Sequence, residues 1–184
     1  FCARPILFFT CMRAWPRRLW DWDRSYRYVG ASGGGGLGYG LGASIGVALA
    51  HKGKGRIVVD LQPDGDMLYP PQAIWTAVHE KIPLLIVMYN NRSYFNSETH
   101  AGTMAKGRAR PMENCGIGTH ITEPNVDFAA LARSFGAHAE GPIEDPAEIR
   151  PALQRAVNLL KKDGMPVLVD IVCGKEERGG GREE

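Results

Sequence analysis

The sequence lacks the features that several classes of protein require. Its 184 residues carry a formal net charge of only +2, too little to indicate binding to nucleic acid or to an anionic membrane. No apolar run approaches the ~20 residues of a membrane-spanning helix. The apolar stretch 5–12 is too short to span a bilayer and lacks the layout of a signal peptide. We therefore expect neither a nucleic-acid partner nor a membrane partner.

Cysteine is scarce, and its spacing does not suit metal or disulfide chemistry. The four cysteines stand at positions 2, 11, 115 and 173, and none forms a C-x-x-C pair or a zinc-type spacing with histidine. We interpret them as free thiols of a reducing compartment and expect a cytoplasmic protein. The chain does not begin with methionine, which leads us to expect a fragment or a trimmed chain.

Strands and helices alternate through most of the chain. Short apolar runs predict buried strands at 56–61, 84–89 and 166–172. Helices are predicted at 43–50, 71–80, 128–135 and 145–162, with Pro151 delaying the start of the last one. Loops are predicted at 62–69 and 92–124, and the histidines of the longer loop, His100 and His120, are secondary candidates for a contact with substrate. This alternation is typical of an α/β fold, a parallel sheet with helices on both faces.

The chain divides into three segments. Residues 1–28 have no steady period and are expected to be irregular, 29–173 to form the α/β domain, and 174–184 to form a charged, glycine-rich, disordered tail. The domain opens with a stretch at 30–46 that is dense in glycine and leads into the first predicted helix. Because glycine has no Cβ, this stretch lets the backbone approach a ligand closely.

Polar residues follow two successive predicted strands. Asp64-Gly65 comes after the first strand and Asn90-Asn91 ends the second, so that Asn91 lies 27 positions after Asp64. In parallel sheets, ligands bind beyond the carboxyl ends of the strands, which share one edge. A carboxylate, an amide oxygen and a backbone carbonyl suit Mg2+, which completes an octahedral shell with phosphate oxygens and water. We therefore predict that this edge binds Mg2+ and a diphosphate.

The sequence around this pair resembles the C-terminal, diphosphate-binding domain of thiamine-diphosphate-dependent enzymes of the acetolactate synthase and benzoylformate decarboxylase group. The resemblance covers about residues 33–172. It rests on Pro63-Asp64-Gly65, on Asn90-Asn91, and on the flanking stretches GGLGYGLGASIGVALA, AIWTA and IPLLIVMYNNRSY. It implies a thiamine-diphosphate-binding fold with thiamine diphosphate and Mg2+ as cofactors.

The resemblance also implies roles for individual residues. Asp64 and Asn91 would bind Mg2+ through their side chains, and Ser93 through its backbone carbonyl. Leu37 would wedge between the two rings of the cofactor, while the Gly35 carbonyl would accept a hydrogen bond from the pyrimidine amino group. The other expected cofactor contacts are Gly36, Gly38, Asn91 and the backbone N–H groups of Gly65 and Asp66.

Two residues depart from the family pattern. Pro63 replaces the first glycine of the motif, which removes an N–H donor. Asp66 stands where small hydroxyl residues are common, and its carboxylate would repel a diphosphate unless it faces away or helps the metal. Both departures favour a second hypothesis, a non-catalytic module that keeps the fold without the cofactor.

The resemblance implies a lyase or transferase that acts on small 2-keto acids, namely a decarboxylase or carboligase similar to acetolactate synthase. In such an enzyme the cofactor carries out the bond-breaking chemistry, and the protein binds and orients it. In this family the glutamate that activates the cofactor lies on a separate pyrimidine-binding domain, for which this chain has no room. We therefore expect no catalytic residue in this chain, a pyrimidine-binding domain on the same or another chain, and a homo-oligomer.

A dinucleotide-binding site of the Rossmann type is a further alternative. Gly33, Gly35 and Gly38 fit the G-x-G-x-x-G pattern, and Asp60 ends the next predicted strand at a suitable distance. That site needs a buried strand immediately before the glycines, yet residues 25–29 are polar. It also leaves the paired asparagines unexplained. It predicts NAD binding that does not depend on metal.

Overall fold

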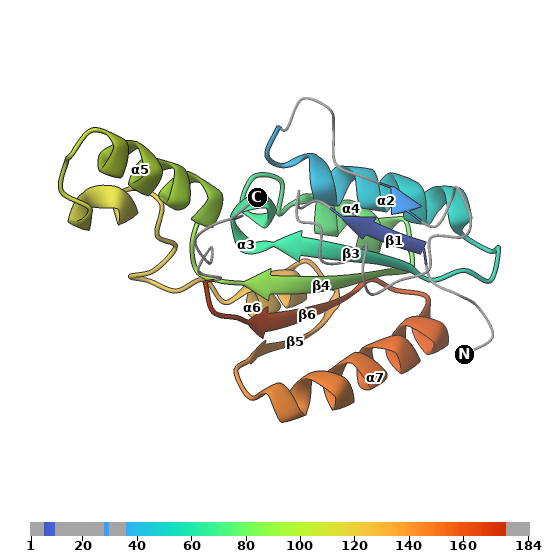
Figure 1. Cartoon of the computed structure of the whole chain (residues 1–184). Coiled ribbons are helices and arrows are strands. Elements are labelled where there is room, and N and C mark those ends of the chain that lie inside the picture. Colours follow the sequence, from blue (N-terminus) through green and yellow to red (C-terminus); the bar gives the residue numbers. More distant parts are fainter. Residues whose placement is uncertain (1–5, 10–27, 30–35, 176–184) are drawn as a thin grey trace, which may run out of the picture.

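The computed structural model describes residues 6–9, 28–29 and 36–175. They form a six-stranded sheet of order β2-β1-β3-β4-β6-β5, in which neighbouring strands run parallel (Figure 1). The strands are β1 (Ile6–Phe9), β2 (Tyr28–Val29), β3 (Val58–Pro63), β4 (Leu84–Asn90), β5 (His138–Ile143) and β6 (Val167–Val172). The predicted parallel α/β architecture is confirmed.

Helices lie between the strands and cover both faces of the sheet (Figure 1). They are α2 (Tyr39–His51), α3 (Asp64–Met67), α4 (Ala73–His79), α5 (Phe95–Gly107), the 3-10 helix η2 (Glu113–Gly116), α6 (Phe128–Ser134) and α7 (Pro146–Asp163). None of the helices in the described ranges combines the length and the hydropathy that crossing a membrane requires.

The core has two parts, one on each face of the sheet. On one face α2, α4 and α6 bury Leu41, Ile74 and Phe128, which are all 0% exposed. On the other face α7 packs Ala152 and Leu160 against β6. Full burial of a large apolar side chain stabilises a fold by about 1.5–3 kcal/mol, so these helices hold the sheet rigid beneath the loops at its edge.

The start of α7 differs from the prediction. The helix begins directly after Asp145, whose side chain accepts a hydrogen bond from the Ala147 N–H at 2.9 Å. Pro146 occupies the first turn, where its missing N–H costs nothing. The prediction that Pro151 delays the helix is wrong, because the cap and the first-turn proline already fix the start and Pro151 lies inside the helix.

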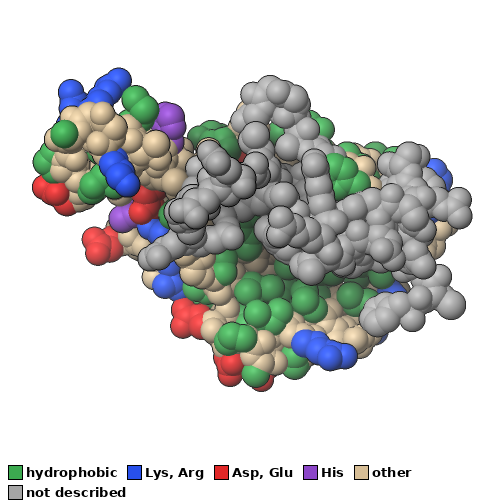
Figure 2. All heavy atoms as spheres, in the orientation of Figure 1, with side chains coloured by type: hydrophobic (Ala, Val, Ile, Leu, Met, Phe, Trp, Pro, Cys, Tyr) green, Lys and Arg blue, Asp and Glu red, His purple; other side chains and the backbone are tan. Residues whose placement is uncertain are grey.

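Both predicted loops contain helix. Residues 62–69 complete β3 and then form α3, while residues 92–124 contain α5 and η2. Helix α5 was not predicted because it has no apolar stripe, and its buried residue is Gly102. It stands out from the rest of the domain, with charged side chains on its surface (Figure 2). Because it packs little against the domain, its sequence has no row of apolar residues at helical spacing.

Three further strands, β1, β2 and β5, were not predicted. The segment 1–28 was expected to be irregular, but it supplies β1, which lies between β2 and β3, and the beginning of β2. Strand β1 has the short apolar sequence ILFF, and β2 has only two residues. Strand β5 is an edge strand with mostly half-buried residues and the sequence HAEGPI, whose glycine and proline disfavour a strand.

Strand β3 places two polar side chains in the larger core. Asp60 and Gln62 follow Val58 on one face of the strand and are both 0% exposed. The Ser44 Oγ lies 2.9 Å from the Leu41 carbonyl oxygen and 2.8 Å from the Asp60 Oδ2. A hydroxyl has one proton, so when it donates to the carbonyl, the Asp60 carboxyl must donate to it. Burial raises the pKa of Asp60 to about 8, in agreement with a neutral carboxyl.

We expect Asp60→Asn to make the domain less sensitive to pH. In the folded chain the pKa of Asp60 is about 8, whereas in the unfolded chain it is near the ordinary value of 3.8. Between those values the folded state holds a proton that the unfolded state has released. Each pH unit therefore lowers the free energy of unfolding by up to about 1.4 kcal/mol. An asparagine amide N–H donates as the neutral carboxyl does, without that dependence.

Urea unfolding at about pH 5 and pH 8 measures this difference between the parent and Asp60→Asn. Asp127→Asn is the matched control, because Asp127 is an exposed helix cap whose role asparagine also fills. Equal pH slopes for the parent and Asp60→Asn would mean that Asp60 is ionised in the fold.

Candidate functional site

The register of two central strands sets the position of the site. Pro63, the last residue of β3, pairs with Tyr89 of β4, so the residues that follow both strands emerge at the same edge of the sheet. Pro63 takes an extended conformation with φ −77° and ψ 151°, and the proline that replaces a glycine of the family pattern thus continues the strand. Asp64 and Asn91 therefore leave the sheet as neighbours.

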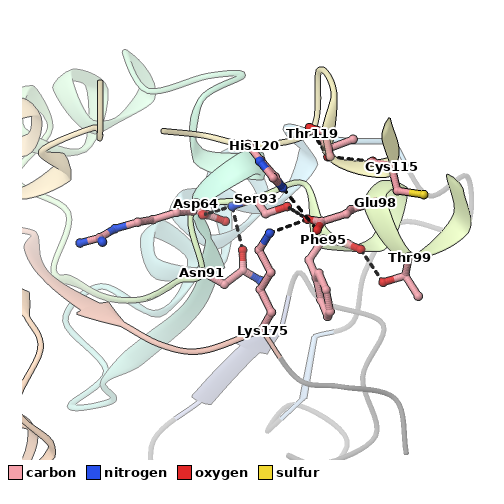
Figure 3. Close-up of polar contacts among 12 residues, drawn as sticks. Asp64, Asn91, Ser93, Phe95, Glu98, Thr99, Cys115, Thr119, His120 and Lys175 are labelled. Carbon is pink, nitrogen blue, oxygen red and sulfur yellow. Dashed lines mark hydrogen bonds and ion pairs between the residues drawn. The ribbon is translucent and has the colours of Figure 1, made fainter. Parts of the chain in front are cut away.

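The three predicted metal ligands come together at this edge (Figure 3). The Ser93 N–H donates to the Asp64 Oδ2 at 3.1 Å and to the Asn91 Oδ1 at 3.0 Å. A donor shared in this way holds the carboxylate oxygen and the amide oxygen side by side. The Gly65 N–H, which was expected to face the diphosphate, donates to the Asp64 Oδ1 at 2.9 Å.

The environment of Asp64 suits a cation. The residue is 1% exposed, and burial raises the pKa of its carboxyl, an effect that the N–H groups of Gly65 and Ser93 oppose. Hydrogen bonds from amides stabilise the ionised form but leave its negative charge uncompensated. The Asp64 carboxylate and the Asn91 amide oxygen are both oxygen donors of the kind that Mg2+ prefers.

Within residues 6–9, 28–29 and 36–175 there is no cluster of three or more His, Cys, Asp or Glu side chains that could hold a metal ion. A cation here would therefore need oxygen ligands from a bound phosphate and water, which is the usual coordination of Mg2+ beside a diphosphate.

Gly65 lies against the ring of Tyr94. A Cβ added to Gly65 would lie 2.6 Å from two carbons of that ring, so glycine is required at this position. Tyr94 also contacts Tyr69 edge to face, with ring centroids 6.3 Å apart. Nothing in the sequence singled out Tyr94, because its partner is a glycine 29 positions earlier.

The described part of the glycine-rich stretch begins at Gly36 and leads into α2. Gly38 caps this helix with φ 83°, and a Cβ there would lie 2.8 Å from the Tyr69 Cβ. The neighbouring Leu37 is 54% exposed, so its side chain is accessible to a ligand. Gly35, predicted to accept a bond from the cofactor, lies outside the described residues.

The Asp66 carboxylate is turned toward the glycine-rich stretch. Its Oδ1 accepts a hydrogen bond from the Gly38 N–H at 2.6 Å, and its Oδ2 accepts one from the Gln62 amide at 2.8 Å. The side chain is nearly buried, since Asp66 is 6% exposed. The departure from the family pattern at this position therefore has a structural partner within the chain.

A second polar cluster lies behind Ser93 (Figure 3). The Glu98 Oε2 accepts hydrogen bonds from the Ser93 Oγ at 2.6 Å and from the Lys175 Nζ at 2.7 Å. The His120 Nε2 lies 3.3 Å from the Glu98 Oε1. Burial opposes ionisation of this carboxyl, yet the three donors lower its pKa to about 2.

This cluster corrects one expectation from the sequence. Lys175 belongs to the tail that was predicted to be disordered, but it is ion-paired with Glu98 of α5. His120, an exposed residue of the predicted loop, contacts the same carboxylate, and its backbone bridges to Ser93. Neither contact has a local sequence signal, because Lys175 lies 77 positions from Glu98.

Comparison with known proteins identifies the family of the chain. A family model described as "Thiamine pyrophosphate enzyme, C-terminal TPP binding domain" matches residues 9–171. The chain is 28% identical over 104 residues to sulfoacetaldehyde acetyltransferase of Alcaligenes xylosoxydans xylosoxydans. That match covers 56% of this chain and 15% of the relative.

Solved structures share the fold. Benzoylformate decarboxylase from Polynucleobacter necessarius superposes with a TM-score of 0.72 at 24% identity, covering 96% of this chain and 31% of that one. The thiamine diphosphate-dependent 4-hydroxybenzoylformate decarboxylase of Rhodococcus jostii RHA1 gives 0.65 at 26% identity, with 85% and 26% covered. The chain spans less than one third of each of these relatives. It belongs to the thiamine pyrophosphate enzymes, as a C-terminal TPP-binding domain.

Proposed function

We propose that the chain binds thiamine diphosphate through Mg2+ as part of a decarboxylase or carboligase that acts on small 2-keto acids. One observation carries the proposal: a single N–H, that of Ser93, holds the Asp64 and Asn91 side-chain oxygens together at the carboxyl ends of β3 and β4. When bound, the cofactor supplies an electron sink for the breaking of the bond next to the keto carbon.

Each predicted site residue has a part in this proposal. Asp64 and Asn91 hold Mg2+ through their side chains, and Ser93 through its carbonyl. The half-exposed Leu37 wedges between the cofactor rings, which gives a function to an apolar side chain that the core does not bury. The remaining cofactor contacts are Gly35, Gly36, Gly38, Gly65 and the Asp66 N–H.

The chain supplies only one half of the proposed active site. It spans 15% of the acetyltransferase and 31% of the benzoylformate decarboxylase, and those relatives carry out different reactions. We propose an acetolactate-synthase-like lyase or transferase of the cytoplasm, assembled as a homo-oligomer. Its pyrimidine-binding domain, on this or another polypeptide, provides the glutamate that activates the cofactor and most substrate contacts.

Asp64→Ala is expected to weaken Mg2+-dependent binding of thiamine diphosphate at least about a hundredfold while leaving the fold intact, since a Mg2+ site with few protein ligands loses its one carboxylate. Calorimetry on the domain assembled with its pyrimidine-binding domain measures the loss. Asp127→Ala, at the exposed cap of α6, serves as the control for a removed carboxylate.

The same titrations separate the alternatives. Cofactor binding by Asp64→Ala as tight as in the parent contradicts the ligand assignment. NAD binding without metal would instead favour the dinucleotide site. A parent that binds neither NAD nor thiamine diphosphate with Mg2+ would be a non-catalytic module.

Gly65→Ala is expected to destabilise the domain by about 1–3 kcal/mol, because overpacking of a filled site costs that much. The new methyl group would lie 2.6 Å from the Tyr94 ring. Truncating the ring in Gly65→Ala/Tyr94→Ala removes the clash, so the two substitutions are expected to compensate. Urea unfolding of the single and double variants measures the coupling. Simple additivity of the two losses would show that the ring does not confine residue 65.

A further inference from the structure

We propose that Asp66 is a positioning residue that fixes the glycine-rich stretch, and with it Leu37, relative to the metal-binding edge of the sheet. This inference rests on the proposed cofactor site and deepens it. In the proposed site, Leu37 contacts the cofactor rings, while Asp64 and Asn91 hold Mg2+ and the diphosphate. The inference is about how Leu37 is positioned.

Both carboxylate oxygens of Asp66 are engaged, and each joins a different element. The Oδ1 accepts from the Gly38 N–H at 2.6 Å across 28 positions of sequence, and the Oδ2 accepts from Gln62 of β3 at 2.8 Å. Gln62 is 0% exposed, so its amide is anchored in the core. The carboxylate therefore links the start of α2 to the end of β3.

The start of α2 depends on this link. Gly38 is the N-cap of the helix and has no side chain to bind the free N–H groups of the first turn. Its own N–H points at the Asp66 carboxylate from another helix, which gives a charge-assisted hydrogen bond. Gly38 also lies close to Tyr69, whose N–H donates to the backbone carbonyl of Asp66. Gly38 therefore contacts the turn 66–69 at two points.

The side chain of Leu37 is 54% exposed, so packing in the core constrains it only in part. The adjacent Gly38 N–H is hydrogen-bonded to Asp66, and that carboxylate therefore constrains the backbone that carries Leu37. Both oxygens of the Asp66 carboxylate already have partners within the chain, Gly38 and Gln62.

Two probes distinguish positioning from a role at the metal. We expect Asp66→Ala to weaken binding of thiamine diphosphate with Mg2+ by about tenfold or more, the effect of losing a charge-assisted bond. Binding of inorganic pyrophosphate with Mg2+, which has no rings to place, is expected to change by less than about twofold. Both are measured by calorimetry on the domain assembled with its pyrimidine-binding domain.

Asp66→Asn is the conservative variant. Its amide oxygen still accepts from the Gly38 N–H. Its NH2 group would face the Gln62 NH2 group, so the Gln62 amide has to turn by 180° and accept through its oxygen, which has no hydrogen-bond partner among the described residues. It is therefore expected to restore most of the affinity for thiamine diphosphate. Should Asp66→Ala fail to fold, Asp66→Leu carries the same expectation, since it keeps a branched side chain at this buried position but offers no acceptor to the Gly38 N–H.

Hydrogen exchange supplies a readout that is independent of the cofactor. We expect faster exchange of the amides at 36–41 in Asp66→Ala, with unchanged exchange in β4 and β6. Unchanged exchange at 36–41, or equal weakening of thiamine diphosphate and pyrophosphate, would overturn the positioning role. A parent that binds neither Mg2+ complex would refute the proposed function instead, and unchanged binding of both complexes by Asp66→Ala would refute the role of Asp66 alone.

Discussion

The site depends on one backbone N–H, that of Ser93, which holds a carboxylate and an amide oxygen in place at the same time. The two side chains come from loops after different strands, and they meet because the parallel register pairs Pro63 with Tyr89. The helices packed on both faces of the sheet fix that register. The positions of the atoms in these two hydrogen bonds therefore depend on the packing of the whole sheet.

Charge at this edge is arranged in two layers. The Asp64 carboxylate is buried and accepts hydrogen bonds from two backbone amides, whereas Glu98 behind Ser93 is ion-paired with Lys175 and contacts His120. Ser93 belongs to both layers, because its N–H faces Asp64 and its hydroxyl faces Glu98. Glu98 of α5, together with Lys175, therefore helps to fix Ser93, whose N–H orients Asp64.

How much the sequence predicted depends on how far apart the interacting residues are. Asp64 and Asn91 were predicted because each sits at the end of an apolar strand, a local pattern. The contact of Asp66 with Gly38 spans 28 positions and that of Glu98 with Lys175 spans 77, and periodicity in the sequence does not indicate such contacts. Helix α5 and strand β5 were missed for a related reason: they bury little apolar surface, so their sequences carry no packing signal.

The strand order has a consequence for synthesis of the chain. Strand β6 inserts between β4 and β5, and in the described sheet β5 is hydrogen-bonded to β6 alone. Until residue 172 has emerged from the ribosome, one side of the apolar β4 has no partner strand, and β5 has nothing to pair with. An unpaired apolar strand is a template for association with other chains. The nascent polypeptide therefore exposes an unpaired apolar strand, which favours aggregation, until β6 of the described sheet has been made.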